Sequence, residues 1–341
     1  MSRQVPPAAI EAAAARIAGR VERTPLLSSR TAARFVAERH GVLLGAGPPG
    51  DGVGRLFVKA EHLQVTGSFK PRGATNRVAQ LTADERARGI ITISAGNHAQ
   101  AVAYAASALG VAATVVMPAN ASRSKAAAAT GYGAQVVLHG EHVGEALAHM
   151  ERVRDEHHLV VVHPFDDPEV IAGAGTVGLE IVDDLPEVDV VVVAVGGGGL
   201  ISGIASAVKA RRPQARVYGV EPELSNALSL GVAAGVPVRL DPRSIADGLG
   251  APFAGYWAID IARRYVEEVI LVDEPTIARG VRFALERMKQ LLEPAGATAL
   301  GAVLAGRIPI RDGETVAVVA SGGNVDLARL PAILDLAGEG W

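Results

Sequence analysis

Lys70 is the lysine in this chain that is best placed for covalent chemistry. It lies in the run Ser68-Phe69-Lys70-Pro71-Arg72-Gly73-Ala74, just past a strand expected over 55–60. A partly desolvated primary amine loses its proton readily and can form a Schiff base with a carbonyl group. Most lysines stay protonated on wet surfaces, so a solvated lysine at a helix start is the alternative. Lys70 by itself does not decide between these two interpretations.

A run of four glycines is the second chemical feature. Gly196 to Gly199 follow an apolar strand expected over 190–195 and precede a helix expected over 200–208. Without side chains, the backbone can approach a ligand closely and direct several N–H groups and a helix dipole at one anion. A phosphate group suits this arrangement. Tight packing of the helix on the sheet is the alternative, although four glycines cost backbone entropy.

The glycine spacing does not match the two common nucleotide-binding motifs. The dinucleotide fingerprint G-x-G-x-x-G, started at Gly196 or Gly197, ends on Ile201 or Ser202. A P-loop ends in Gly-Lys-Ser/Thr, and the next lysine here is Lys209. ATP is therefore not the expected ligand of this loop.

Two polar turns repeat the order of strand, turn and helix. Ser94 to Asn97 lie between a strand expected over 89–93 and a helix over 98–109. Ser321 to Asn324 lie between a strand over 315–320 and a helix over 325–336. The first turn suits a carboxylate, with helix capping by its polar side chains as the alternative. Open parallel sheets bind ligands at the carboxyl ends of their strands, so we expect all four features at one crevice.

Taken together, these residues resemble the fold type II family of pyridoxal phosphate enzymes, in particular its serine/threonine dehydratase (threonine ammonia-lyase) and serine racemase branch. The resemblance covers nearly the whole chain. The motifs that carry it are Thr24-Pro25-Leu26, the run from Lys59 to Lys70, Ser94-Ala95-Gly96-Asn97-His98-Ala99-Gln100, Val195 to Leu200, Gly219-Val220-Glu221-Pro222, Glu293-Pro294-Ala295-Gly296-Ala297 and Ser321-Gly322-Gly323-Asn324.

The resemblance implies a role for each site residue. Lys70 would form a Schiff base with the aldehyde of pyridoxal 5'-phosphate and later move the Cα proton, and Ser321 would face the pyridine nitrogen. The cofactor contacts would come from Phe69, Lys70, Asn97, Gly196, Gly197, Gly198, Gly199, Leu200 and Ser321. The amino-acid carboxylate would be bound by Ser94, Ala95, Gly96, Asn97 and His98.

The implied reaction is a dehydration. Because a serine at the pyridine nitrogen makes the ring a weaker electron sink than an aspartate would, elimination is favoured over reactions that need a long-lived carbanion. Water would leave L-threonine or L-serine through an aminoacrylate-type intermediate, giving a 2-oxo acid and ammonia. Racemases of this type carry a serine where this chain has Ala95, so we expect slow racemisation. Serine racemase, 3-hydroxyaspartate dehydratase, a threonine synthase-like lyase and an amino-acid-binding regulator are the alternatives.

A divalent cation site is implied only in part. Relatives bind the cation with a Glu-Pro segment and an acidic residue six positions on, whereas Glu221-Pro222 is followed by Ala227 at that position. Glu221 could still hold Mg²⁺ or Ca²⁺ together with carbonyl and water oxygens. An ion-paired or solvated glutamate at a strand end is the alternative.

Composition restricts the partners and the compartment. The net charge of −3 predicts neither nucleic acid nor an anionic membrane as a partner, and zero cysteines exclude thiol catalysis, disulfides and zinc-thiolate sites. The start of the chain lacks the apolar core of a secretory signal, and no window resembles a membrane span. We therefore expect a cytoplasmic protein, and the resemblance implies that it acts on a small amino acid.

Alternating strands and helices predict a doubly wound α/β architecture. The resemblance implies a tryptophan synthase beta-like arrangement of parallel sheets in two domains, and a homodimer. Residues 1–81 and 161–341 would form the large cofactor-binding domain, and residues 82–160 a small inserted domain with strands over 90–93, 113–118 and 135–138. The run 45–54, rich in glycine and proline, predicts a surface loop.

Overall fold

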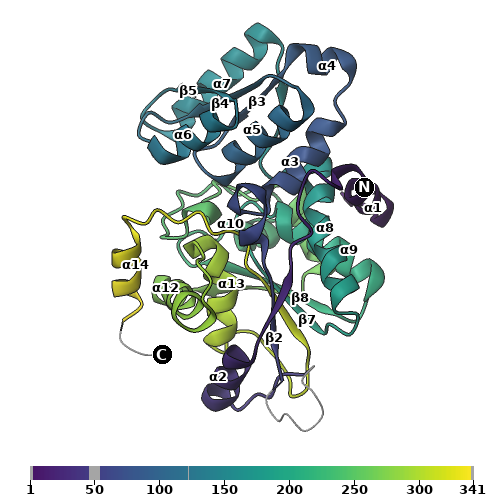
Figure 1. Cartoon of the computed structure of the whole chain (residues 1–341), viewed down its shortest axis with the longest axis vertical. Helices are drawn as coiled ribbons and strands as arrows, with labels where there is room; N and C mark the ends of the chain where they lie inside the picture. The colour runs from purple at the N-terminus through teal and green to yellow at the C-terminus, as the bar shows by residue number, and fades with distance from the viewer. Residues whose placement is uncertain (1–2, 46–53, 122, 339–341) are drawn as a thin grey trace.

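Two β-sheets with helices on both faces organise the chain (Figure 1). The computed structural model describes residues 3–45, 54–121 and 123–338. The six-stranded sheet has the order β1-β2-β10-β7-β8-β9, and the four-stranded sheet has the order β5-β4-β3-β6. All neighbouring strands in these sheets are parallel except β1 and β2. The predicted α/β class is therefore confirmed.

The strands of the six-stranded sheet are β1 (Leu26–Ser29), β2 (Leu56–Lys59), β7 (Val190–Ala194), β8 (Arg216–Pro222), β9 (Glu268–Val272) and β10 (Val316–Val319). The strands of the four-stranded sheet are β3 (Ile90–Ile93), β4 (Ala113–Met117), β5 (Gln135–Leu138) and β6 (Val160–Val161). The helices are α1 (Pro7–Ile17), α2 (Arg30–His40), α3 (Lys70–Ala79), α4 (Ala83–Arg88), α5 (Asn97–Leu109), α6 (Arg123–Gly131), α7 (Val143–His157), α8 (Pro168–Asp184), α9 (Gly199–Arg211), α10 (Ala227–Ala234), α11 (Tyr256–Tyr265), α12 (Glu274–Phe283), α13 (Pro294–Leu304) and α14 (Leu330–Leu336).

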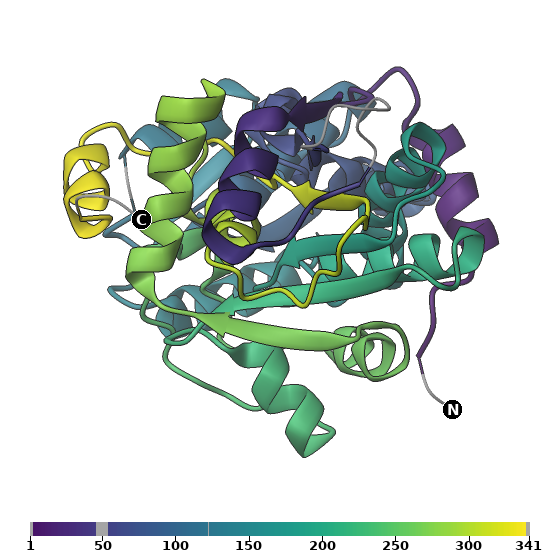
Figure 2. The same ribbon diagram turned by 90° about the horizontal axis from the view of Figure 1, so that it is seen from below.

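The six-stranded sheet is buried on both faces, which explains its valine-rich central strands. In β7, Val190 and Val192 pack with α2, α12 and α13, whereas Val191 and Val193 pack with α8, α9 and α11. Figure 2 shows helices on both sides of this sheet. Side chains alternate along a strand, so a strand covered on both faces is apolar at every position.

The four-stranded sheet forms the upper part of the molecule in Figure 1, with α4 to α7 around it and α3 between the two sheets. Ile90 and Val115 face the core that includes α5, while Ile91 and Val116 pack against α7. Its β6 ends at Val161, one residue beyond the range proposed for the small domain. The domain bounds themselves stay a prediction.

The helix predicted over 325–336 is wrong in its first five residues. Val325 is irregular and residues 326–329 form a turn, in which the Asp326 side chain accepts a hydrogen bond from the Ala328 N–H, and α14 begins at Leu330. Pro331 explains the late start, because proline lacks an N–H and is tolerated only in the first turn of a helix. For the predicted surface loop over 45–54, residues 46–53 lie outside the described residues.

None of the helices in the three described ranges is long and apolar enough to cross a lipid bilayer.

Candidate active site

A cavity of about 370 Å³ lies where β3, β7 and β10 end and α3 begins. Its lining includes Phe69, Lys70, Ser94, Ala95, Gly96, Asn97, His98, Gly196, Gly197, Gly198, Gly199, Leu200 and Ser321. The structure thus brings together every residue predicted to bind cofactor or substrate. Glu221, the proposed metal ligand, is not among the lining residues.

Lys70 is the first residue of α3, and its amine lies at the wall of the cavity. Its Nζ atom donates a hydrogen bond to the carbonyl oxygen of Pro164 at 2.8 Å and lies 5.1 Å from the centre of the Phe69 ring. Burial lowers the pKa of Lys70 to about 8, because a charged amine is poorly solvated there. Near neutral pH a useful fraction of this amine is therefore unprotonated and nucleophilic.

The turn before Lys70 is held in a strained backbone conformation. Thr66 has a φ of +63°, in the left-handed region that β-branched residues rarely adopt. The turn is tied to the segment after β10, since the Phe69 N–H donates to the Ser321 carbonyl oxygen at 3.1 Å and Ser68 pairs with Gly322. Such strain clusters at functional sites, where the surrounding structure maintains it.

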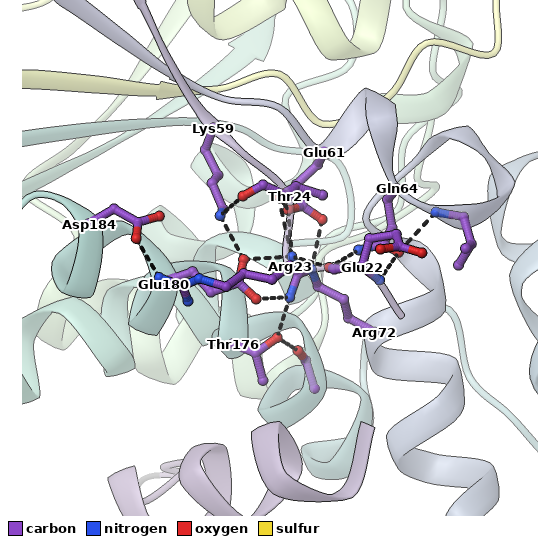
Figure 3. Close-up of polar contacts among 12 residues, drawn as sticks. Glu22, Arg23, Thr24, Lys59, Glu61, Gln64, Arg72, Thr176, Glu180 and Asp184 are labelled. Carbon is purple, nitrogen blue, oxygen red and sulfur yellow. Dashed lines mark hydrogen bonds and ion pairs between the residues drawn. The ribbon is translucent and has the colours of Figure 1, made fainter. Parts of the chain in front are cut away.

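Arg72, two residues after Lys70, anchors α3 in a buried ion network that sequence reasoning missed (Figure 3). Its Nε atom lies 2.7 Å from Glu61 Oε2, and its guanidinium also lies 2.7 Å from Glu180 Oε1 on α8. Lys59, at the end of β2, lies 2.6 Å from the second oxygen of Glu180 and donates to the Thr24 carbonyl oxygen. The network therefore joins α3 to α8, β2 and the N-terminal segment.

The charges of this network balance, with two cations and two anions. Arg72, Lys59 and Glu61 are each no more than 1 % exposed. Burial alone would lower the pKa of Arg72, but Glu61 and Glu180 outweigh it and raise that pKa. Because each charge is paired, removal of one partner would leave an uncompensated buried charge next to the start of α3.

The four glycines form a turn with unpaired backbone amides at the start of α9. Within the described part of the chain, the amides of Gly196 to Leu200 donate no hydrogen bond to another group. Gly198 has a φ of +89°, which favours glycine. A Cβ atom added at Gly197 would overlap the ring of Phe165, so close packing also requires a glycine there. Free amides at a helix N-terminus suit a phosphate group.

The Ser94 turn presents the N-terminus of α5 to the cavity. The Ser94 Oγ atom accepts a hydrogen bond from the Gly96 N–H at 3.1 Å, and α5 has no side-chain cap. His98 is buried, and its Nε2 atom lies 3.0 Å from the Val162 carbonyl oxygen. Burial, helped by the nearby Lys70 charge, lowers the pKa of His98 to about 3. His98 is therefore a neutral structural residue. The N–H groups of Ala95, Asn97 and His98, which donate to no other group in the described ranges, remain available to a carboxylate.

Asn97 and Ser321 both line the cavity, and Asn97 is held by residues without a predicted role. Asn97 Nδ2 donates to Glu293 Oε1 at 2.6 Å, and Asn97 Oδ1 accepts from Asn324 Nδ2 at 2.8 Å. Ser321 is 5 % exposed at the end of β10. The sequence analysis includes Glu293 and Asn324 in motifs but assigns them no function. The available signal was a carboxylate directly before a helix, at Glu293, and an amide shortly after a strand, at Asn324.

Glu221 is buried at β8 and caps α10. Its carboxylate accepts hydrogen bonds from the Leu228 N–H at 2.7 Å, the Ser229 N–H at 2.9 Å and the Ser229 hydroxyl at 2.7 Å. Burial raises the pKa of Glu221 to about 7, against the effect of these hydrogen bonds. No three His, Cys, Asp or Glu side chains gather as a metal site in the ranges that the structure describes. The geometry favours the capping role over a cation ligand.

Residues 23–322 match the family described as pyridoxal-phosphate dependent enzyme. A curated L-threonine ammonia-lyase from Thermotoga maritima is 44% identical over 83% of this chain and 70% of its own length.

Two solved structures are similar along almost the whole chain. A threonine deaminase from T.th. has a TM-score of 0.82 at 40% identity, covering 94% of this chain and 98% of that one. Maize serine racemase has a TM-score of 0.87 at 35% identity, covering 97% of each chain.

Proposed function

The chain belongs to the family of pyridoxal-phosphate dependent enzymes, and we propose that it removes water from L-threonine or L-serine to release a 2-oxo acid and ammonia. The observation that carries this proposal is the pairing, in one cavity, of a desolvated lysine with free amides at a helix N-terminus. A phosphorylated aldehyde requires these two features, because the nucleophilic amine reacts with the aldehyde and the free amides bind the phosphate.

The residues of the cavity fit pyridoxal 5'-phosphate. The amides of Gly196 to Leu200 would bind its phosphate, Asn97 its ring hydroxyl and Ser321 its pyridine nitrogen. When bound, the cofactor supplies a carbonyl for the lysine amine and a conjugated ring that accepts electrons from the substrate Cα atom. Phe69, beside Lys70, would cover the ring.

Lys70 is the base of the proposed reaction. With its pKa near 8, the amine would accept a proton from the substrate Cα atom at little energetic cost, and a proton together with the hydroxide that leaves Cβ makes the water that is released. The neighbouring His98 stays neutral near pH 7 and does not compete for that proton. The Ser94 turn at the start of α5 would hold the substrate carboxylate and so direct the Cα–H bond toward Lys70.

The charges of the cavity favour a substrate with a neutral side chain. Lys70 is the one basic side chain besides the neutral His98 among the described lining residues, and two carboxylates, Asp247 and Glu293, line the same cavity. A second carboxylate, as in 3-hydroxyaspartate, would find no lining cation other than Lys70 in a cavity that already contains two carboxylates. Serine and threonine have no such group.

The remaining alternatives are weaker. Ala95 lines the cavity without an exchangeable proton, which disfavours a racemase. A regulator that only binds an amino acid does not need a desolvated lysine beside free backbone amides that can bind an anion.

We also propose a homodimer, because Leu63 and Leu291, which flank the hydrogen-bonded pair His62 and Gln290, are 52% and 38% exposed. The cytoplasm stays the proposed location.

Substrate assays test the function directly. The purified protein, loaded with pyridoxal 5'-phosphate, is mixed separately with the L and D isomers of serine and threonine and with the isomers of 3-hydroxyaspartate. We expect 2-oxo acid and ammonia from L-threonine or L-serine, and neither from Lys70→Ala. Absence of both products from the native protein would remove the dehydratase assignment, and a preference for 3-hydroxyaspartate would overturn the substrate class.

A further inference from the structure

Asn324 links three separate segments at the edge of the cavity. Its Nδ2 group donates to the Thr66 carbonyl oxygen at 2.7 Å and to Asn97 Oδ1 at 2.8 Å. Thr66 belongs to the turn before α3, Asn97 begins α5, and Asn324 lies in the turn after β10. A Cβ atom added at Gly67 would overlap the Asn324 side chain, so the glycine makes room for this contact.

These contacts fix the orientation of the Asn97 amide. Asn324 offers Asn97 a donor on one side, and the Glu293 carboxylate offers it an acceptor 2.6 Å away on the other. An amide satisfies both only when its oxygen faces Asn324 and its NH₂ group faces Glu293. One N–H hydrogen of Asn97 then remains for a ligand in the cavity that Asn97 lines.

The same side chain supports the turn that carries Lys70. Thr66 holds a left-handed backbone, and its carbonyl oxygen accepts the second hydrogen of the Asn324 amide. Strained residues keep such a conformation only when surrounding contacts impose it. Both hydrogens of the Asn324 amide are therefore used, one on the lysine turn and one on the α5 turn.

We propose that Asn324 is a positioning residue, which keeps the Asn97 N–H directed at an anionic oxygen of the bound cofactor and holds the Thr66 turn in register with it. The proposal deepens the function proposed above and rests on it. Asn324 acts through Asn97 and Thr66, and the ligand chemistry that it selects is a deprotonated ring hydroxyl. With the amide of Asn97 reversed, an oxygen would face that anion and repel it.

The test compares Asn324→Ala and Asn324→Asp with the native protein. Asn324→Asp keeps the shape of the side chain but places an acceptor oxygen where the donor was. Asn120→Asp is the matched control, because Asn120 is exposed and this substitution adds the same charge away from the cavity. If Asn324→Ala fails to fold, the Asp variant, with its native shape, is measured alone.

The first measurement is hydrogen exchange of the unloaded protein. We expect faster exchange over residues 64–70 and 94–98 in both Asn324 variants and unchanged exchange in Asn120→Asp. This result does not depend on the proposed reaction, so it remains interpretable if L-threonine and L-serine prove not to be substrates. Native-like exchange in both segments would overturn the role of Asn324.

The second measurement is the affinity and colour of the loaded protein. We expect the dissociation constant of pyridoxal 5'-phosphate to rise about tenfold or more, as for a lost hydrogen bond to a charged group. The visible absorption band should titrate about one pH unit higher in the Asn324 variants, because the deprotonated hydroxyl loses its donor. A merely structural role would leave that titration in place, and an unshifted titration in a folded variant would contradict the proposal.

Discussion

The amine of Lys70 is held 2.8 Å from the carbonyl oxygen of Pro164, a residue 94 positions further along the chain. Pro164 follows β6 of the four-stranded sheet, whereas Lys70 begins the helix between the two sheets. The hydrogen bond thus keeps the amine at the cavity wall while burial lowers its pKa to about 8. This combination makes the unloaded site ready to react with an aldehyde.

The stability of the unloaded protein should depend on the charge of Lys70. The folded protein loses this proton near pH 8 and the unfolded chain near pH 10.5, so between these values the unfolded chain binds more protons. The Lys70 contribution to the free energy of unfolding therefore rises with pH across that window. Urea unfolding of the native protein and of Lys70→Met is measured across this pH window. The free energy of unfolding of the native protein should increase relative to that of the variant as the pH increases. A constant difference would contradict the lowered pKa.

Ala95→Ser should increase racemisation. Ala95 lines the cavity in the turn expected to hold the substrate carboxylate, and a serine hydroxyl there would supply a proton to the face of Cα opposite Lys70. We expect D-serine to form from L-serine faster in the variant, measured by chiral chromatography. Ala95→Val is the control, since it fills space without an exchangeable proton. No gain in D-serine would show that residue 95 does not face the Cα atom.

Arg72→Met should destabilise the protein by about 3 to 5 kcal/mol, because it leaves the buried Glu61 without its cation and Glu180 with Lys59 alone. Arg243→Met is the matched control, since Arg243 pairs with Asp241 at the surface and both side chains are 79% exposed. Such surface pairs contribute about 1 kcal/mol or less. Denaturant unfolding of both variants measures how far each substitution lowers the free energy of unfolding. Equal decreases in the two variants would mean that the network does not anchor α3.

Glu221 should not require a divalent cation. Three hydrogen-bond donors at the start of α10 already occupy its carboxylate, and a cation would have to displace them. We expect the thermal midpoint to stay the same in Mg²⁺, Ca²⁺ or a chelator. A ligand that binds the folded state raises the midpoint. An increase with Ca²⁺ that Glu221→Gln abolishes would therefore establish the cation site.

The sequence predicted the cavity well because its residues follow strands. Lys70, the Ser94 turn, the glycine run and Ser321 each come directly after a strand or at the start of a helix, and parallel strands bring such positions together. The resemblance to a known family added the roles. Pro164, by contrast, shows no local signal, since its carbonyl oxygen acts through a contact with a distant side chain.

The structure was needed for contacts between segments far apart in the chain. Arg72 and Glu180 are 108 residues apart, and Asn97 and Asn324 are 227 apart. Local pattern cannot reveal such pairs, because neither partner's neighbours indicate where the other will lie. The missed start of α14 has a different cause, since Pro331 gave a local signal that outweighs the helical periodicity before it.

Lys70 should be the residue that binds the cofactor aldehyde, and reductive mapping identifies that residue. The loaded protein is treated with borohydride, which converts a Schiff base into a stable amine, and is then digested and analysed by mass spectrometry. The chain has only five lysines, at positions 59, 70, 125, 209 and 289. We expect the added phosphopyridoxyl mass on the peptide that contains Lys70 and nowhere else. Modification of another lysine, or of none, would mean that Lys70 does not bind the cofactor.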